Sequence, residues 1–281
     1  MSRSSLPARI ARSPRGALSA LFLLGLVLCA LLAYWIAPYD YASQNLSLAN
    51  SPPSPAHWLG TDEFGRDLLS RIIQGARTSL SVSVLSIALS VAVGASLGAA
   101  AGYFGGVFDR IVTVIVDLTW SFPEILLALI LIAILGPGLH STAIAIGIAY
   151  LAQFTRLTRA QVMTLKNEVF IEASINIGAS PTRILFCHLL PNAITPVIVA
   201  GMLATGDAIV LEATLGFFGL GAQPPLPSWG AMMSSGTAQI FIAPWIIVFP
   251  GLVIAATVIA INLFGDALIE ALDIRRPLRD G

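Results

Sequence analysis

Residues 159–192 read RAQVMTLKNEVFIEASINIGASPTRILFCHLLPN, and this polar stretch between two apolar runs decides how the chain is organised. Its spacing predicts two short helices, 161–177 and 181–190, joined at Gly178. Glycine there favours a left-handed end to the first helix, and Ser180 can cap the second helix. A helix–glycine–helix elbow outside a membrane has the shape of a docking element, although the residues alone fit a plain connector equally well.

The composition indicates that the flanking apolar runs lie in a membrane. Of 281 residues, 56% are hydrophobic and 11% are charged, whereas soluble domains carry about 25% charged residues. The 15 basic and 15 acidic residues give zero net charge, so a nucleic-acid partner has no electrostatic basis. The two cysteines, Cys29 and Cys187, are far apart, so we expect no disulfide framework and no metal site.

The predicted fold class is an all-α polytopic membrane protein with six transmembrane helices, because six apolar runs can cross a hydrocarbon core of ~30 Å. The predicted spans are 17–37, 80–101, 111–135, 142–158, 193–215 and 245–264. The other segments are an N-tail at 1–16, an outer loop at 38–79, the elbow loop at 159–191, an outer Gly/Pro-rich loop at 216–244 and a C-tail at 265–281. The first apolar run exceeds a typical signal peptide and no A-x-A site follows it, so we expect an uncleaved anchor.

The distribution of Lys and Arg orients the spans. With a cytoplasmic N-terminus, twelve of the fifteen basic residues fall on the inner side and three fall between the first two spans. The sequence therefore predicts that both termini and the 159–191 loop are cytoplasmic.

The outer loop at 38–79 contains an amphipathic pattern. From Asp62 onward, apolar residues repeat at helical spacing with polar residues between them. We expect this helix to lie flat on the outer membrane interface. In the next span, small residues recur every fourth position at Gly94, Gly98 and Gly102, which favours close packing against another helix.

Five stretches, in order along the chain, resemble motifs of ABC-importer inner-membrane permeases in the dipeptide/oligopeptide/nickel family. EASINIGAS at 172–180, with HLLPN after it, resembles the EAA loop of these permeases. The other four are HWLGTDEFGRDLLSR at 57–71, GYFGGVFDR with DLTWSFPE at 102–124, LEATLGFFGLGAQPPLPSWG at 211–230 and NLFGDALIEALD at 262–273. Ser174, Gly216 and Ile274 depart from the common residues at their positions, and they leave the solute open.

The resemblance implies a type I ABC importer permease fold and one half of a translocation pore in a bacterial cytoplasmic (inner) membrane. It implies four kinds of partner: a homologous second permease, two cytoplasmic ABC ATPases, an extracytoplasmic solute-binding protein and membrane lipid. ATP and Mg would be bound by the ATPases, so this chain is expected to hold no cofactor and to be no enzyme. The residues implied to couple to the ATPases are Glu172, Ala173, Ser174, Gly178, Ala179 and Ser180. The solute would be a dipeptide or oligopeptide, with glutathione and nickel as alternatives.

Four carboxylates lie within predicted spans, where unpaired charge is costly. Asp117 and Glu124 are two helical turns apart on one face, whereas Asp207 and Glu212 are roughly 140° apart around their helix. Glu124 and Asp207 reach a similar depth, about 20 Å from the inner ends of their spans. We expect this pair to line the translocation path and favour a cationic group, and Asp117 and Glu212 to be structural hydrogen-bond acceptors. Neutralisation of the first pair against backbone or a partner subunit is an equally good interpretation.

Two other classes of protein fit less well. An ion- or proton-coupled secondary transporter would use such acids, but it needs no cytoplasmic elbow, and no inverted repeat is evident. A membrane enzyme would need a catalytic cluster, yet His57, His140 and His188 are expected on the outer, outer and inner sides. The sequence contains no H-E-x-x-H and no Walker motif, so energy must come from a partner.

Overall fold

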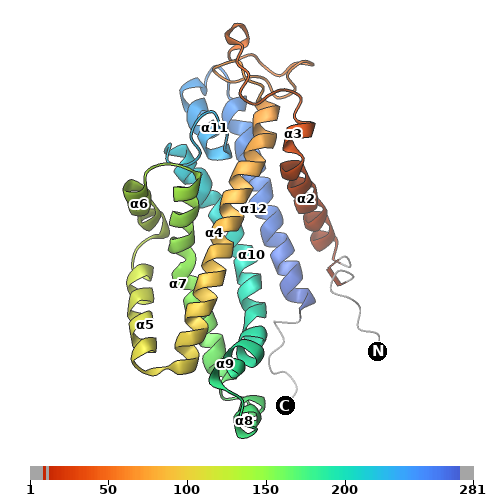
Figure 1. Ribbon diagram of the computed structural model, residues 1–281. Helices are drawn as coiled ribbons and strands as arrows, with labels where there is room; N and C mark the ends of the chain where they lie inside the picture. The colour runs from red at the N-terminus through yellow and green to blue at the C-terminus, as the bar shows by residue number, and fades with distance from the viewer. Residues whose placement is uncertain (1–8, 11–12, 273–281) are drawn as a thin grey trace. The chain divides into compact units, whose positions relative to one another are not determined.

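A computed structural model describes residues 9–10 and 13–272, and within these ranges the regular elements are all helical. They are α2 (Pro14–Leu31), α3 (Ala33–Ile36), η1 (Leu46–Leu48), α4 (Leu68–Phe104), α5 (Gly106–Trp120), α6 (Glu124–Leu135), α7 (Leu139–Leu165), α8 (Val169–Asn176), α9 (Pro181–Arg183), η2 (Ile184–Leu189), α10 (Leu190–Phe217), α11 (Trp229–Gly236), η3 (Thr237–Gln239) and α12 (Trp245–Ala271) (Figure 1). The predicted all-α class is thereby confirmed. Most of the predicted N-tail and residues 273–281 of the predicted C-tail lie outside the described residues.

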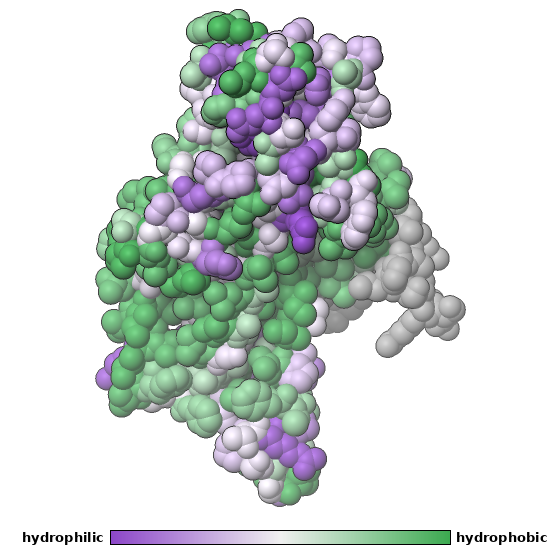
Figure 2. Space-filling model, turned by 45° about the horizontal axis from the view of Figure 1, so that its top comes forward, coloured by the Kyte–Doolittle hydropathy of each residue, from purple (hydrophilic) through white to green (hydrophobic). Residues whose placement is uncertain are grey.

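Four helical segments of the described chain are long and apolar enough to cross a membrane. They are α2, α4, the run Pro181–Phe217 and α12. A fifth crossing results if α5 and α6 together form one broken span. Hydrophobic residues cover much of the middle and lower part of the face in Figure 2, as expected for a protein that lipid surrounds, and hydrophilic residues gather toward its top. The count of six spans and the cytoplasmic termini stay predictions.

The region predicted as one helix at 111–135 contains two helices in the structure. Helices α5 and α6 meet at an angle of 96° across residues 121–123. Pro123 immediately precedes α6, and proline both lacks a backbone N–H and disfavours helical geometry in the residue before it. The chain therefore ends one helix at Trp120 and begins a new one at Glu124.

The start of α4 also differs from expectation, because it is not a separate helix lying flat on an interface. Helix α4 runs without interruption for 37 residues. The polar side chains near its N-terminus are buried rather than solvated: Asp67 is 3% exposed, Ser70 0% and Arg71 7%. The preceding segment folds over them, since the Tyr39 N–H donates to Ser70 Oγ and the Arg71 guanidinium donates to the Tyr41 carbonyl.

The chain divides into two compact units, each with its own core. Unit 1 comprises Met1–Val84, Ile132–Ala143 and Thr205–Gly281, and unit 2 comprises Leu85–Leu131 and Ile144–Ala204. In unit 1, α2 and α11 pack against α12 (Figure 1), and the fully buried Trp229 lies among aliphatic side chains. In unit 2, side chains from α7, α8 and η2 form a cluster around Val162, Ile171 and Leu189.

Candidate functional site

The elbow at 169–183 is held by backbone hydrogen bonds and belongs entirely to unit 2. At the end of α8, the Gly178 N–H donates to the Ile175 carbonyl at 2.9 Å and the Ala179 N–H donates to the Ser174 carbonyl at 3.1 Å. This pair of bonds around a glycine with φ of +80° is the Schellman ending of a helix. The Ser180 side chain then accepts the Arg183 N–H and caps the next helix.

The elbow has one buried face and one exposed face. Ile171 and Ser174 point into the unit 2 core, where the Ser174 hydroxyl donates to the Phe170 carbonyl. Glu172 and Ala173 are exposed, and so is the apolar side chain of Ile177 at 86%. The structure thus presents an acid beside exposed apolar surface, on a turn fixed by its hydrogen bonds.

The three spaced glycines of α4 lie against α7. A Cβ at Gly94 would lie 2.9 Å from the Cβ of Phe154, and one at Gly102 would lie 2.9 Å from the Arg159 carbonyl. At Gly98 an added Cβ would collide with the Thr155 carbonyl oxygen. The backbones of these two helices are therefore too close for any side chain at these positions.

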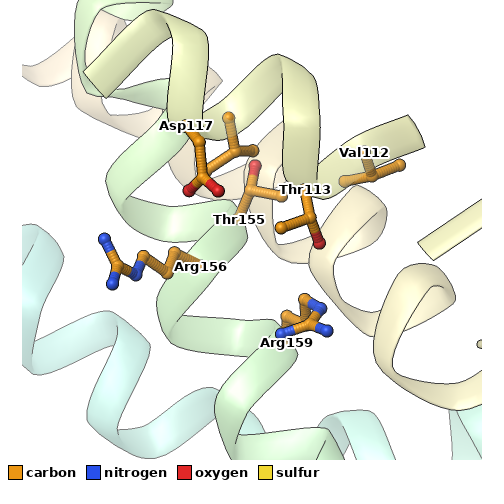
Figure 3. A pocket seen from close by; sticks show the side chains of 7 residues that line it. Val112, Thr113, Asp117, Thr155, Arg156 and Arg159 are labelled. Carbon is orange, nitrogen blue, oxygen red and sulfur yellow. The ribbon is translucent and has the colours of Figure 1, made fainter. Parts of the chain in front are cut away.

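The polar groups of α5, α6 and α7 line two cavities of unit 2. The first, which we call the Asp117 cavity, has a volume of about 160 Å³ and is lined by Thr113, Asp117, Thr155, Arg156 and Arg159 among others. Figure 3 shows Asp117 pointing from α5 toward α7, while Arg156 and Arg159 leave α7 in different directions. The second, the Glu124 cavity, has a volume of about 240 Å³, and Trp120, Glu124 and Gln153 contribute to its lining.

Arg159 and Arg156 have different partners although they are one turn apart on α7. Arg159 forms a two-pronged ion pair with Asp109 at the start of α5, with Nη2 donating to Oδ2 at 2.7 Å. The Cζ of Arg156 instead lies 5.4 Å from the centroid of the Trp120 ring. Asp117, Glu124 and Arg156 are all exposed in unit 2.

The two acids of α10 within unit 1 have opposite environments. Asp207 is exposed, whereas Glu212 is 0% exposed. The hydroxyl groups of Ser79 and Ser228 are next to the Glu212 carboxyl, but neither carboxyl oxygen has a partner in hydrogen-bonding geometry. Trp229 closes this region, with its indole N–H donating to the Ile72 carbonyl at 3.1 Å.

Comparison with known proteins identifies the family of the chain. The family model described as "Binding-protein-dependent transport system inner membrane component" matches residues 94–276. The chain belongs to this family. The model "N-terminal TM domain of oligopeptide transport permease C" also matches, at residues 8–53. The protein is therefore a membrane permease component of an ABC importer, and the family is one of transport proteins rather than enzymes.

Curated relatives cover most of the permease. It is 45% identical over 253 residues to the glutathione transport system permease protein GsiD of Salmonella typhimurium, covering 90% of this chain and 84% of the relative. The GsiD of Shigella flexneri serotype 5b is 44% identical over 266 residues, covering 94% and 88%. The resemblance to ABC-importer permeases that the motifs indicate is thereby confirmed.

The fold is shared with a solved transporter. A chain of the MetNI methionine ABC transporter in an inward-facing conformation matches with a TM-score of 0.58 at 20% identity, over 72% of this permease and 96% of that chain. A second crystal form of the same transporter gives a TM-score of 0.56. At this identity the likeness concerns the fold alone.

Several residues that line the cavities were not singled out by the sequence. Gln153 and Arg156 are three residues apart on α7, and Trp120 lies just before the Pro123 break. Polar side chains spaced by three in an otherwise apolar helix share one face and could have been noticed. That Gln153 lines one cavity with Glu124, and that Arg156 contacts Trp120, follows only from the packing of these helices.

Proposed function

We propose that this permease forms one half of a pore that imports short peptides, with a homologous permease as the other half. Family membership and the GsiD relatives support a solute of this class. The observation that carries the proposal is the elbow at 169–183, a hydrogen-bonded turn with exposed Glu172 between apolar helices. A secondary transporter would have no need of such an element.

In this proposal the elbow docks a cytoplasmic ABC ATPase, and its partner permease docks a second one. Glu172, Ala173 and Ser174 on α8, with Gly178, Ala179 and Ser180 in the turn, form the coupling element. Exposed Ile177 and the hydrogen-bonded turn support this role, since an apolar and rigid surface can transmit motion to the helices that flank it. ATP and Mg belong to the ATPases, and an extracytoplasmic binding protein delivers the solute.

We propose that Glu124 and Asp207 line the translocation path, each within its own unit. Both are exposed acids in apolar helices, and such groups face water or protein rather than lipid. Glu212 is proposed to have a structural role, because it is fully buried beside two serine hydroxyls. Asp117 is exposed and lines a cavity with two arginines, and its role as a structural hydrogen-bond acceptor stays a prediction.

The proposed topology has six spans and cytoplasmic termini, which single-cysteine labelling tests. In a background with Cys29 and Cys187 replaced, an impermeant thiol reagent added from outside should label a cysteine at position 50. It should not label cysteines at position 167 or 279. Strong external labelling at either inner position would contradict the orientation.

The experiment that tests the function is uptake by the reconstituted transporter. Proteoliposomes that contain both permeases and the ATPases receive binding protein loaded with dialanine, glutathione or Ni²⁺. ATP-dependent accumulation of a peptide is the expected result. Import of Ni²⁺ alone would replace the peptide assignment with a metal one, and import independent of ATP would refute the ABC mechanism for this chain.

A further inference from the structure

Unit 2 carries two opposite charges, on Glu124 and Arg156, that form no ion pair. Glu124 lines the Glu124 cavity together with Trp120 and Gln153. Arg156 lines the Asp117 cavity and its guanidinium lies over the same Trp120 ring. Trp120 therefore lines one cavity together with Glu124 and contacts Arg156, which lines the other cavity.

Within residues 9–10 and 13–272, neither charged group has an ion-pair or hydrogen-bond partner, and Arg156 contacts only the Trp120 ring by its charge. The Glu124 carboxylate and the Arg156 guanidinium form no ion pair and no hydrogen bond there, and Asp117 is not paired with Arg156 although both line one cavity. Arg159, one turn away, is by contrast held by Asp109. An unpaired charge in a membrane helix faces water, another protein surface or a bound ligand, because lipid does not solvate it.

We propose that Glu124 and Arg156 are the two ends of a subsite for a zwitterionic peptide, with Arg156 binding a carboxylate of the solute and Glu124 binding its ammonium group. Trp120 and Gln153 contact the part of the solute between these ends. The inference rests on the proposed import of short peptides and narrows the solute to one that carries both charges.

The chemistry of the two side chains supports this assignment. A guanidinium presents paired N–H donors that match a carboxylate, which Lys or a neutral amide does less well. A carboxylate beside an aromatic ring suits an ammonium group, since both attract a cation. A bare metal ion would be repelled by Arg156, so the same site disfavours Ni²⁺.

The test measures peptide imported per ATP hydrolysed, in proteoliposomes with the complete transporter. Binding protein is loaded separately with dialanine and with its C-terminal amide, so that delivery to the permease is equal. Arg156→Gln should lower dialanine import per ATP by about tenfold or more, because a charge-assisted bond to the carboxylate is lost. The amide has no carboxylate, so its import should change less than twofold.

Matched variants separate solute binding from structure. Arg110→Gln removes an exposed positive charge from the same helix as Trp120 but lines neither cavity, and it should behave as the wild type. If Arg156→Gln does not assemble, Arg156→Lys keeps the charge and loses the two-pronged geometry, and a fall in the dialanine-to-amide import ratio still supports the subsite.

Two results distinguish failure of the inference from failure of the proposed function. Wild-type proteoliposomes that import neither dialanine nor glutathione would refute peptide import itself. If the wild type imports glutathione but not dialanine, glutathione replaces dialanine as the test solute. Normal peptide import per ATP in Arg156→Gln, or an equal loss for acid and amide, would overturn the subsite while leaving peptide import intact.

Discussion

Replacing Gly178 by valine tests whether the elbow geometry couples ATPase to transport. The residue has φ of +80°, and no atom outside its chain neighbours lies within 4 Å of an added Cβ. Any effect therefore comes from backbone strain and not from a steric clash. A β-branched residue in this region costs about 2 kcal/mol, which lowers the population of the native turn about thirtyfold relative to a straightened one.

The assay compares two quantities in membranes that contain equal amounts of permease. ATPase retained on affinity-purified Gly178→Val transporter and ATP-dependent peptide uptake should both fall at least tenfold. Gly178→Asn should lose much less, because asparagine tolerates left-handed backbone better than other residues.

Gly219 provides a matched control in unit 1. It has φ of +77°, open space around an added Cβ and the same pair of hydrogen bonds, donated by Gly219 to Gly216 and by Leu220 to Leu215. Gly219→Val thus carries equal strain far from the elbow in sequence, and it should keep ATPase bound. Full ATPase retention and full uptake in Gly178→Val would refute the role of this turn.

Three further predictions concern packing and buried charge. Gly98→Leu should sharply reduce the yield and thermal stability of the purified permease, because an added Cβ meets the α7 backbone, whereas Gly25→Leu should change neither since open space surrounds it. Glu212→Gln should keep or raise the melting temperature, since the carboxyl oxygens have no partner to lose; a large drop would show that they do. A double-mutant cycle with Asp109→Asn and Arg159→Gln should give a coupling of about 0.2–1 kcal/mol, because both side chains are partly exposed, and a coupling above about 2 kcal/mol would contradict this.

The elbow was predictable because its determinants are local. Gly178, Ser180 and Pro181 each favour one backbone conformation through their own covalent chemistry, and the structure contains the corresponding helix end and cap. The two helices around the turn are shorter than predicted. A turn at 166–168 separates α7 from α8, which begins at Val169, and α9 is followed by the π-helical turn η2.

The break between α5 and α6 was also encoded locally, at Pro123, but an apolar run of sufficient length conceals it. Hydropathy measures whether a segment can enter a membrane, and it does not detect a change of direction within that segment. The 96° bend depends on one proline, which hydropathy alone does not reveal.

The buried polar start of α4 could not be predicted from periodicity. The helical pattern identifies Arg66, Asp67 and Arg71 as one polar face, but it does not say what covers that face. In the structure Asp62 accepts ion pairs from both arginines, at 2.7 and 3.3 Å, beneath the returning outer segment. The same limit applies to Arg156 and Glu124, which become neighbours of one tryptophan only through tertiary packing.

The glycine ridge of α4 has a mechanical consequence. Because Gly94, Gly98 and Gly102 leave no side-chain layer between this part of α4 and α7, the two helices cannot slide or rock against each other without a collision of backbones. We therefore expect these two helical segments to move as one rigid body. The elbow begins a short turn after α7 ends, so we expect a displacement imposed there to move α7 and this part of α4 together.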